Sequence, residues 1–463
     1  MKKARIIFCF LILFLLFGCN ASYPQMATLD LTTEPTTTAK TFTSSPLEKT
    51  IQPFTNTPLP SSTITHWFTS TPKPTFTPTP TPTDNPETGE KYHCLDVAHM
   101  LESSVQLEGS LLLQSIEGST VSYYLVNLEN RDLAHAGSLV PMNEDLKGVS
   151  ISPDHKRVVF VNCTDLSSTS CEITVATTAG IANTFPSQTE LGQVYWLDDE
   201  QLVIKPEKAP DNTVTLINSQ TGSESQVTLP LANPYYFHPR GDGYIFYSVI
   251  DPSLTRVIYF SQEGTGQVIM ADVKSGKTLA QLPYLIPEWS DVFPPIIEYE
   301  DGWAPDGSQY ITTSPVTYTE IYTDVPSAVE LFGIQHDGEI RQLTKLTQTY
   351  QTVLIDGYQW SPDGRFIVFW LRSSTRSDIE LDQLAQRLVL LDVQSGNLID
   401  LCLSGTPGYL GSKPVWAPNS SQFAVKLYNQ AGRWTIYIID LDKGIVYPIN
   451  RASDPIGWMA NSP

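Results

Sequence analysis

Acidic side chains are the residues of this chain best suited to chemistry, because the sequence holds 49 Asp and Glu residues against 28 Lys and Arg. Two carboxylates can hydrolyse a glycosidic bond when the fold brings them to within about 5–10 Å of each other. The segment from Asp440 to Gly444 spaces two carboxylates as a calcium loop does, but it lacks the bidentate acid that such a loop needs. No spacing in the sequence selects one pair of acids.

The motifs of common catalytic and metal sites are missing from the sequence. It has no Gly-x-Ser-x-Gly elbow, no His-Glu-x-x-His zinc motif and no phosphate-binding P-loop. It also has no Cys-x-x-Cys pair, and its seven His residues are scattered. We therefore expect no catalytic residue, no cofactor and no metal. The alternative is a glycan-active hydrolase or lyase that uses acidic residues at a central funnel.

The charge excludes one class of partner. Residues 92–463 carry 43 acidic and 21 basic side chains, a net charge of −22. Binding to DNA, RNA or an anionic membrane surface requires a basic footprint. We expect no nucleic-acid partner, and we expect the chain to be a monomer.

Residues 1–18 have the pattern of a signal peptide. Three basic residues precede an apolar run, Ile6 to Phe17, which is too short to span a bilayer. The run ends in Leu16-Phe17-Gly18-Cys19, which resembles the lipobox of bacterial lipoproteins. The resemblance implies that Cys19 carries the lipid, including an acyl group such as palmitate. It also implies an extracytoplasmic protein anchored in the cell membrane or the outer envelope; an ordinary secretory signal is the alternative.

Residues 19–91 are expected to be a linker. Between residues 20 and 91, 33 of 72 positions are Thr or Pro. The segment therefore has too few large apolar side chains to offset the entropy cost of ordering its backbone. Thr-Pro repeats favour extended conformations. We therefore predict a lipidated Cys19, a disordered stalk, and a folded domain over 92–463.

The remaining cysteines fit an exported chain. Cys163 and Cys171 bracket a polar turn between two strand-like runs, so a disulfide across that hairpin is plausible. Cys94 and Cys402 would then remain and could pair. Four cysteines allow three pairings, and the sequence does not choose among them.

A repeat organises residues 92–463. An apolar strand with a Trp or other large residue runs into a Pro-Asp-Gly-like turn and a second apolar strand; Pro sets φ and Gly takes positive φ. The best copy begins at Tyr358 and contains Trp360-Ser-Pro-Asp-Gly364. Other copies have their turns at Pro153, Asp198, Pro239, Pro305 and Pro418.

These copies resemble the TolB-like and WD-repeat-like β-propellers, in which this signature marks the first turn of each blade. The resemblance implies an all-β propeller and, for the class, a role in envelope protein interactions; counting the copies predicts seven blades. Six blades begin at the six turns. The seventh would combine residues 109–137 with a C-terminal strand around Trp458, which closes the ring. Eight blades are the alternative, because residues 251–281 hold spare strand-like sequence.

Long insertions indicate a binding face. In a propeller, loops between the second and third strands share one face with the connections between blades. The insertions at 282–299, 314–327 and 372–386 are of these two types. We expect a protein, peptide or glycan partner there, although the insertions could simply cover blade edges. The candidate residues are Tyr284, Trp289, Asp291, Phe293, Tyr318, Glu320, Tyr322 and Asp324.

Overall fold

The structure is a computed structural model. It describes residues 83–84, 91–97, 107–117, 120–128, 137–141, 146–163, 171–187, 191–206, 213–229, 236–237, 244–245, 248–261, 267–283, 302–316, 328–376, 383–429, 431–449 and 453–460.

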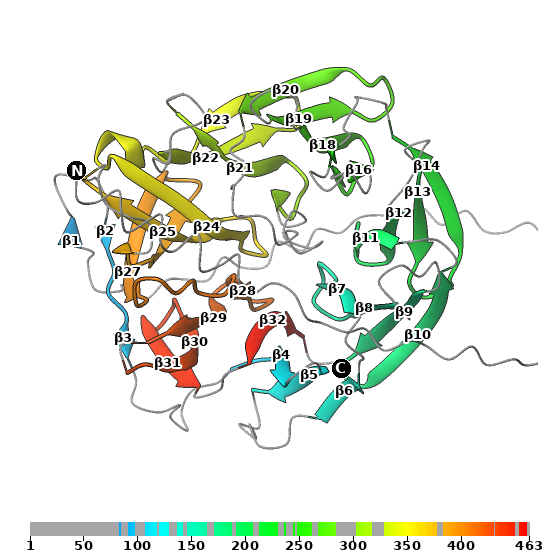
Figure 1. Ribbon diagram of the computed structural model, residues 1–463, viewed down its shortest axis with the longest axis horizontal. Helices are drawn as coiled ribbons and strands as arrows, with labels where there is room; N and C mark the ends of the chain where they lie inside the picture. Colours follow the sequence, from blue (N-terminus) through cyan, green and yellow to red (C-terminus); the bar gives the residue numbers. More distant parts are fainter. Residues whose placement is uncertain are drawn as a thin grey trace, which may run out of the picture. The chain divides into compact units, whose positions relative to one another are not determined.

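The described residues form eight β-sheets; seven of them are blades that follow one another around a central axis (Figure 1), and the eighth is a two-stranded hairpin. This confirms the predicted seven-bladed propeller, and the alternative of eight blades is wrong. Neighbouring strands within each blade are antiparallel, as expected where short turns join consecutive strands.

The blades have these strands, from the centre outwards. Blade 1 contains β32 (Asp454–Met459), β4 (Ser110–Glu117), β5 (Thr120–Asn127) and β6 (Gly137–Pro141). Blade 2 contains β7 (Leu146–Ile151), β8 (Val158–Cys163), β9 (Cys171–Thr177) and β10 (Gly180–Ser187). Blade 3 contains β11 (Leu191–Trp196), β12 (Gln201–Pro206), β13 (Thr213–Asn218) and β14 (Glu224–Thr228). Blade 4 contains β17 (Ser248–Ile250), β18 (Arg256–Ser261), β19 (Gln267–Asp272) and β20 (Thr278–Pro283).

Blade 5 contains the isolated bridge from Trp303 to Tyr310, then β21 (Gln309–Pro315), β22 (Val329–Gln335) and β23 (Ile340–Gln342). Blade 6 contains β24 (Thr352–Trp360), β25 (Phe366–Ser374), β26 (Arg387–Asp392) and β27 (Asn397–Ser404). Blade 7 contains β28 (Val415–Trp416), β29 (Gln422–Tyr428), β30 (Trp434–Asp440) and β31 (Ile445–Ile449). A 3₁₀ turn, η2 (Leu346–Gln348), leads into blade 6.

Blade 4 corrects one prediction from the sequence. The copy around Pro239 is not the first hairpin of a blade: its flanks form a separate two-stranded hairpin, β15 (Tyr236–Phe237) and β16 (Tyr244–Ile245). The blade starts instead at β17, and its first turn is Asp251 to Leu254. Ile250 stands where every other blade except blade 2 has Trp, and Leu254 stands where Gly is expected, so the pattern is hidden in the sequence.

The chain closes into a ring through β32. This C-terminal strand pairs antiparallel with β4, with Trp458 opposite Leu111 (Figure 1). Blade 2 then holds β32 from its other side: the ring Nδ1 of His155 donates to the Trp458 carbonyl at 2.7 Å, and Ala460 N donates to the His155 carbonyl. The closing strand is therefore bonded to two blades.

Indole N–H groups connect neighbouring inner strands. Trp196 donates to Ser150 O, Trp360 to Gly302 O and Trp416 to Gln359 O, each on the preceding blade. Trp458 donates to Glu108 O at 2.8 Å, in the segment that enters β4. Trp303 differs, because its buried Nε1 has no hydrogen-bond partner among the described residues.

The first turns share a left-handed residue. The φ angles are 58° at His155, 58° at Leu254, 69° at Gly307, 68° at Gly364 and 59° at Ser420. A non-Gly residue in this conformation costs about 1 kcal/mol or more. Contacts to the neighbouring blade offset that cost: His155 bonds Trp458 O, and Ser420 Oγ accepts from Asp363 N at 2.9 Å.

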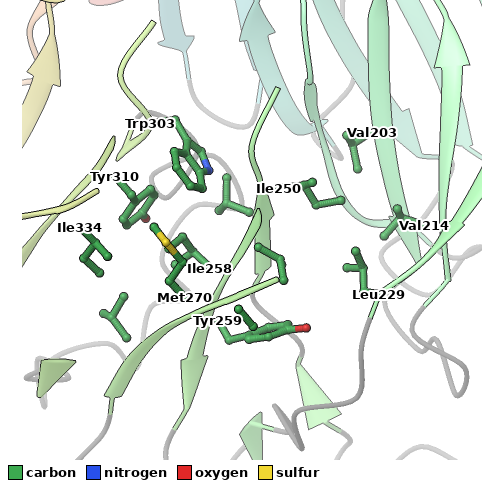
Figure 2. Packing of buried hydrophobic residues seen from close by; sticks show 14 of the residues in the cluster. Val203, Val214, Leu229, Ile250, Ile258, Tyr259, Met270, Trp303, Tyr310 and Ile334 are labelled. Atoms are coloured by element: carbon green, nitrogen blue, oxygen red, sulfur yellow. The ribbon is translucent and has the colours of Figure 1, made fainter. Parts of the chain in front are cut away.

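The core lies between blades rather than inside one. One cluster joins Val203 and Val214 of blade 3 to Ile258 and Met270 of blade 4 and to Ile334 of blade 5 (Figure 2). Sheets that pack face to face bury the side chains that alternate along each strand. Each blade is therefore stabilised by its neighbours.

The N-terminal segment covers the outer edges of blades 6 and 7. β2 (Lys91–Tyr92) runs parallel to β27, β1 (Thr83–Asp84) pairs with β2, and β3 (Asp96–Val97) runs parallel to β31. Strand pairing therefore begins before Tyr92, inside the expected linker. Covering an edge strand removes a template for unwanted pairing.

A disulfide fixes this segment. Cys94 is bonded to Cys402 of β27, and Leu95 is buried among apolar residues of blades 6 and 7. Cys171 is also disulfide-bonded, and the backbone register places Cys163 directly opposite Cys171. A Cys163–Cys171 bond stays a prediction.

Replacing Trp360 and Trp303 separately by Phe should measure how much the indole hydrogen bond contributes to the free energy of unfolding. Trp360→Phe leaves the Gly302 carbonyl without its donor, whereas Trp303→Phe removes a buried donor that has no described partner. We expect Trp360→Phe to lower the free energy of unfolding by about 1 kcal/mol more than Trp303→Phe does. Urea denaturation of both variants measures this, and equal losses would contradict it.

The closure should weaken in acid. Burial lowers the pKa of His155, and its bond to Trp458 O and the charges of Asp154 and Asp199 counteract this only in part. The folded state therefore favours neutral imidazole. Its contribution to stability is complete above the unfolded pKa near 6.5 and is lost as pH falls from there towards the folded pKa.

His155→Asn is the matched variant, because Asn tolerates positive φ and does not titrate. We expect the melting temperature of the wild type to fall more between pH 7.5 and 5.5 than that of His155→Asn. Parallel pH profiles of the two proteins would show that His155 does not couple closure to pH.

Candidate functional site

The binding residues predicted from the sequence cannot be placed. All eight candidates, Tyr284, Trp289, Asp291, Phe293, Tyr318, Glu320, Tyr322 and Asp324, lie outside the described residues, as does Cys19. Their insertions nevertheless start and end at described strands. One follows Pro283 at the end of β20, and the next joins Pro315 of β21 to Val329 of β22.

The strand directions define two faces. We call the face with the loops between second and third strands and the connections between blades the connector face. The face with the first turns and the turns between third and fourth strands is the turn face. A strand of six or seven residues separates the two faces by about 20 Å. Both insertions leave from the connector face.

A cluster of one exposed and two half-buried aromatic side chains lies on the connector face at blades 6 and 7. We call Tyr409, Tyr428 and Trp434 the aromatic platform. Tyr409 belongs to the connection between β27 and β28, whereas Tyr428 and Trp434 flank the loop between β29 and β30. Tyr409 stacks on Tyr428 with ring centroids 4.0 Å apart and an angle of 18°, and Trp434 packs edge-on against both rings.

The surroundings hold the platform in place. Lys426 Nζ lies 4.9 Å from the Trp434 ring centroid and donates to Asp454 Oδ1 at 2.8 Å. The Tyr409 loop is bonded at both ends to β29, through Thr406 N to Tyr428 O and Ser412 N to Lys426 O. Stacking and cation–π contacts each contribute about 0.5–1.5 kcal/mol, so the rings are preorganised.

The platform remains accessible. Tyr409 is 44% exposed and the next residue, Leu410, is 56% exposed. Our reading of the sequence missed this site, because it looked for long insertions and this connection is short. The available signal was an aromatic and an aliphatic residue set between glycines in Pro407-Gly-Tyr-Leu-Gly411.

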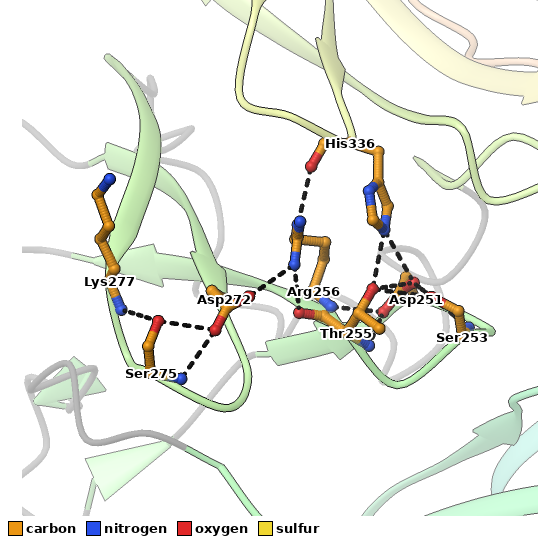
Figure 3. A network of polar contacts seen from close by, with 8 residues as sticks. All are labelled: Asp251, Ser253, Thr255, Arg256, Asp272, Ser275, Lys277 and His336. Carbon is orange, nitrogen blue, oxygen red and sulfur yellow. Dashed lines mark hydrogen bonds and ion pairs between the residues drawn. The ribbon is translucent and has the colours of Figure 1, made fainter.

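A pocket of about 440 Å³ opens on the turn face between blades 4 and 5. Its lining is polar and acidic and comes from three turns, with Asp251, Pro252, Ser253, Asp306, Gly307, Ser308 and His336. Figure 3 shows His336 of the β22–β23 turn directed at Thr255 and Asp251 of the β17–β18 turn. Thr255 Oγ1 lies 2.8 Å from His336 Nε2.

The pocket contains Ser, His and Asp, but their connections are not those of a nucleophile and its base. The Ser253 hydroxyl is bonded to the Asp251 carboxylate, and the described contacts of His336 Nε2 are Thr255 Oγ1 and Asp251 Oδ2. A catalytic Ser needs a base that accepts its proton and an orienting group behind that base. This arrangement does not provide that order.

Asp251 has a structural role. It is buried, and its carboxylate accepts from the backbone N–H groups of Ser253, Thr255 and Arg256 and from two hydroxyls (Figure 3). In blade 6 the same position is Ser361, whose Oγ bonds Asp363 and Phe366 N. In blade 4 one carboxylate thus accepts the turn's hydrogen bonds that two side chains, Ser361 and Asp363, accept in blade 6.

Acids on the innermost strands bear on the glycan-hydrolase alternative. The described strands β7, β11, β17, β24, β28 and β32 contain two acids, Asp356 and Asp454. Asp356 is ion-paired with Arg372 and Asp454 with Lys426, both at 2.8 Å. Each carboxylate therefore faces a cation rather than a second acid.

No group of three or more His, Cys, Asp or Glu residues in the described part of the chain is arranged to hold a metal ion. None of its helices is long and apolar enough to cross a membrane.

Comparisons with known proteins found similarity among solved structures alone. No protein-family model and no curated protein matches the sequence. Among solved structures, TolB from Acinetobacter baumannii is 15% identical with a TM-score of 0.38, over 75% of this chain and 81% of that one. Periplasmic gluconolactonase from Pseudomonas aeruginosa is 16% identical with a TM-score of 0.42, over 77% and 98% of the two chains.

A prolyl endopeptidase is 14% identical with a TM-score of 0.43, over 75% of this chain and 49% of that one. The similar structures thus include both TolB and enzymes. All three TM-scores are below 0.5, so neither a fold nor an activity is transferred from these structures.

Asp251→Asn should test the structural role of this carboxylate. The amide offers one acceptor oxygen and brings a donor into a site full of N–H groups, so we expect a loss of about 2 kcal/mol in unfolding free energy. Asp306→Asn is the control, because Asp306 is exposed and accepts from Ser308 N. Thermal denaturation of both variants measures the difference; equal small losses would mean that Asp251 is not a structural cap.

Proposed function

We propose that this chain is a lipid-anchored, extracytoplasmic propeller that binds a protein or glycan without catalysis, and that it binds on its connector face. The observation that carries the proposal is the aromatic platform. An exposed Tyr side chain held rigid by neighbouring aromatic rings, as Tyr409 is, is typical of a binding hot spot, because little side-chain entropy is lost on contact. The candidate residues of the insertions belong to loops on the same face.

The proposed location rests on the sequence and on the cysteines. Residues 1–18 and Cys19 have the pattern of a lipoprotein signal. The Cys94–Cys402 disulfide fits the same location, since such bonds persist in oxidising compartments. The acidic charge directs the proposal away from nucleic acid and towards a neutral or cationic partner.

An enzyme acting through acids at the central funnel is the alternative that we considered. Paired carboxylates of the kind that hydrolyse glycosides must face each other across the substrate. The ion pairs of Asp356 and Asp454 oppose that arrangement on the described inner strands. The binding role is therefore the better supported of the two.

Cys19→Ser should separate the chain from the membrane. Without the thiol no diacylglyceryl group can be attached, and stable anchoring needs more than one acyl chain. We expect the variant to leave the membrane pellet and to lose incorporation of labelled palmitate. Cys9→Ser is the control and should remain in the pellet with its label; a Cys19→Ser chain that stays labelled in the pellet would refute the anchor.

Tyr409→Ala should weaken binding to cell-surface material. The full chain is incubated with isolated cell envelopes, and the bound fraction is measured by sedimentation. Loss of a hot-spot Tyr typically costs more than about 1.4 kcal/mol, so we expect affinity to fall about tenfold. Ile181→Ser removes an exposed apolar residue of blade 2 and should bind as the wild type does. If Tyr409→Ala also binds like the wild type, the platform is not the site.

A further inference from the structure

We propose, building on the binding role of the connector face, that the ligand of the aromatic platform is a neutral polysaccharide: one pyranose ring stacks on Tyr409, and a sugar hydroxyl reaches the side-chain amide of Gln386. The proposal rests on three observations at the Tyr409 loop.

The first observation is the geometry of Tyr409. One face of its ring lies on Tyr428, at 4.0 Å between centroids, and the side chain is still 44% exposed. A flat ring supported from behind and open in front suits a ligand that is itself flat and apolar on one side. The C–H face of a pyranose has that form, and the negative face of an aromatic ring attracts such positively polarised hydrogens.

The second observation is the small apolar area. Of the five exposed large hydrophobic residues in the described part of the chain, two lie here, Tyr409 and Leu410. The others, Ile181, Val316 and Ile340, belong to blades 2 and 5. A stable protein interface buries about 800 Å² on each partner, whereas one aromatic side chain buries about 150–250 Å². The platform is therefore the right size for one or two sugar rings.

Charge selects a neutral sugar chain. The whole protein has a formal net charge of −21, which repels polyuronates and other anionic polymers at low salt. Beside the platform, the Lys426 ammonium is buried and ion-paired with Asp454. The adjoining turn carries an exposed cation, Arg433, which could attract an anionic sugar instead. The test must therefore distinguish binding of a neutral sugar from binding of an anionic one.

The third observation is an unsatisfied amide beneath the loop. Gln386 is 1% exposed, and neither Oε1 nor Nε2 has a hydrogen-bond partner among the described residues. Burying such a group without partners costs about 1–3 kcal/mol. An amide offers both a donor and an acceptor, which is the chemistry that a sugar hydroxyl needs.

The loop lies directly on this amide. A Cβ added to Gly411 would lie 2.9 Å from Gln386 Nε2 and 2.6 Å from Trp370 Cζ2, so the loop approaches as closely as glycine allows. Gly405 N donates to Gln386 O at the other end of the loop. Between its two anchors to β29, the loop has a backbone hydrogen bond from Tyr409 N to Thr406 O at 3.3 Å. Gln386 is buried in the free protein, so the proposed contact requires the loop tip to move aside when a sugar lies on Tyr409.

Gln386→Met separates a ligand-binding role from a packing role. Met has a similar volume and no polar atoms to satisfy, so the variant should melt at the same temperature as the wild type or higher. Its affinity for the sugar should nevertheless fall about tenfold, because the hydroxyl loses its partner. A residue that served only packing would give the same or higher melting temperature with unchanged affinity.

The experiment is affinity electrophoresis of the full chain in gels that contain hydroxyethyl cellulose, xylan, galactomannan or polygalacturonate. We expect retardation by at least one neutral polysaccharide and none by polygalacturonate. Tyr409→Ala and Gln386→Met should each lower the affinity about tenfold, and Ile181→Ser should leave it unchanged. Retardation by polygalacturonate alone, or variants that bind like the wild type, would overturn the proposal.

The result is also separable from that of the binding role. If envelopes bind the wild type but not Tyr409→Ala, and no neutral polysaccharide is bound, the platform is a binding site and its ligand is not a neutral sugar. If Tyr409→Ala binds envelopes as well as the wild type does, both proposals fail.

Discussion

Each blade of this propeller is stabilised by apolar packing against its two neighbours. The ring of blades therefore needs a junction between the first blade and the last. The apolar residues lie between sheets, so a blade without a neighbour would expose one face of its core. The pairing of β32 with β4 supplies the missing junction, and His155 holds the same strand from blade 2. The indole bonds of the inner strands depend on this closure, because they need adjacent blades at a fixed distance.

The two faces of the ring differ in what their polar groups do. On the turn face, Asp251, Ser361 and Asp363 satisfy backbone N–H groups of tight turns, so carboxylates and hydroxyls in a pocket there belong to the fold. On the connector face, Tyr409 and Leu410 are exposed above rings that hold them still. Acidic residues therefore cluster on the turn face, whereas the rigid, exposed apolar surface lies on the connector face.

The sequence predicts the fold well because the repeat is a backbone requirement. A tight turn between two strands needs a fixed φ and a left-handed residue, and Pro and Gly show this in the copies at Pro305 and Pro362. Prediction fails at blade 4, where the same conformation is adopted by Leu254 and supported by tertiary packing. Such a position carries no local signal.

The candidate site was harder to predict than the fold. Insertion length points to the connector face, but the predicted residues lie outside the described part of the chain, where that face carries one exposed aromatic side chain, Tyr409. The platform itself depends on Tyr409 meeting Tyr428 and Trp434 across two blades, and on Gln386 lying beneath Gly411. These contacts join residues from three separate connections, so no spacing in the sequence records them.

The Cys94–Cys402 bond also decides how the domain responds to a mechanical pull. Tension on the chain before Cys94 passes through the disulfide into β27, a strand bonded along its length to β26. A covalent link at the rim therefore keeps a pull on the N-terminal side from acting directly on blade 1, where β32 is joined to β4 by backbone pairing and apolar packing.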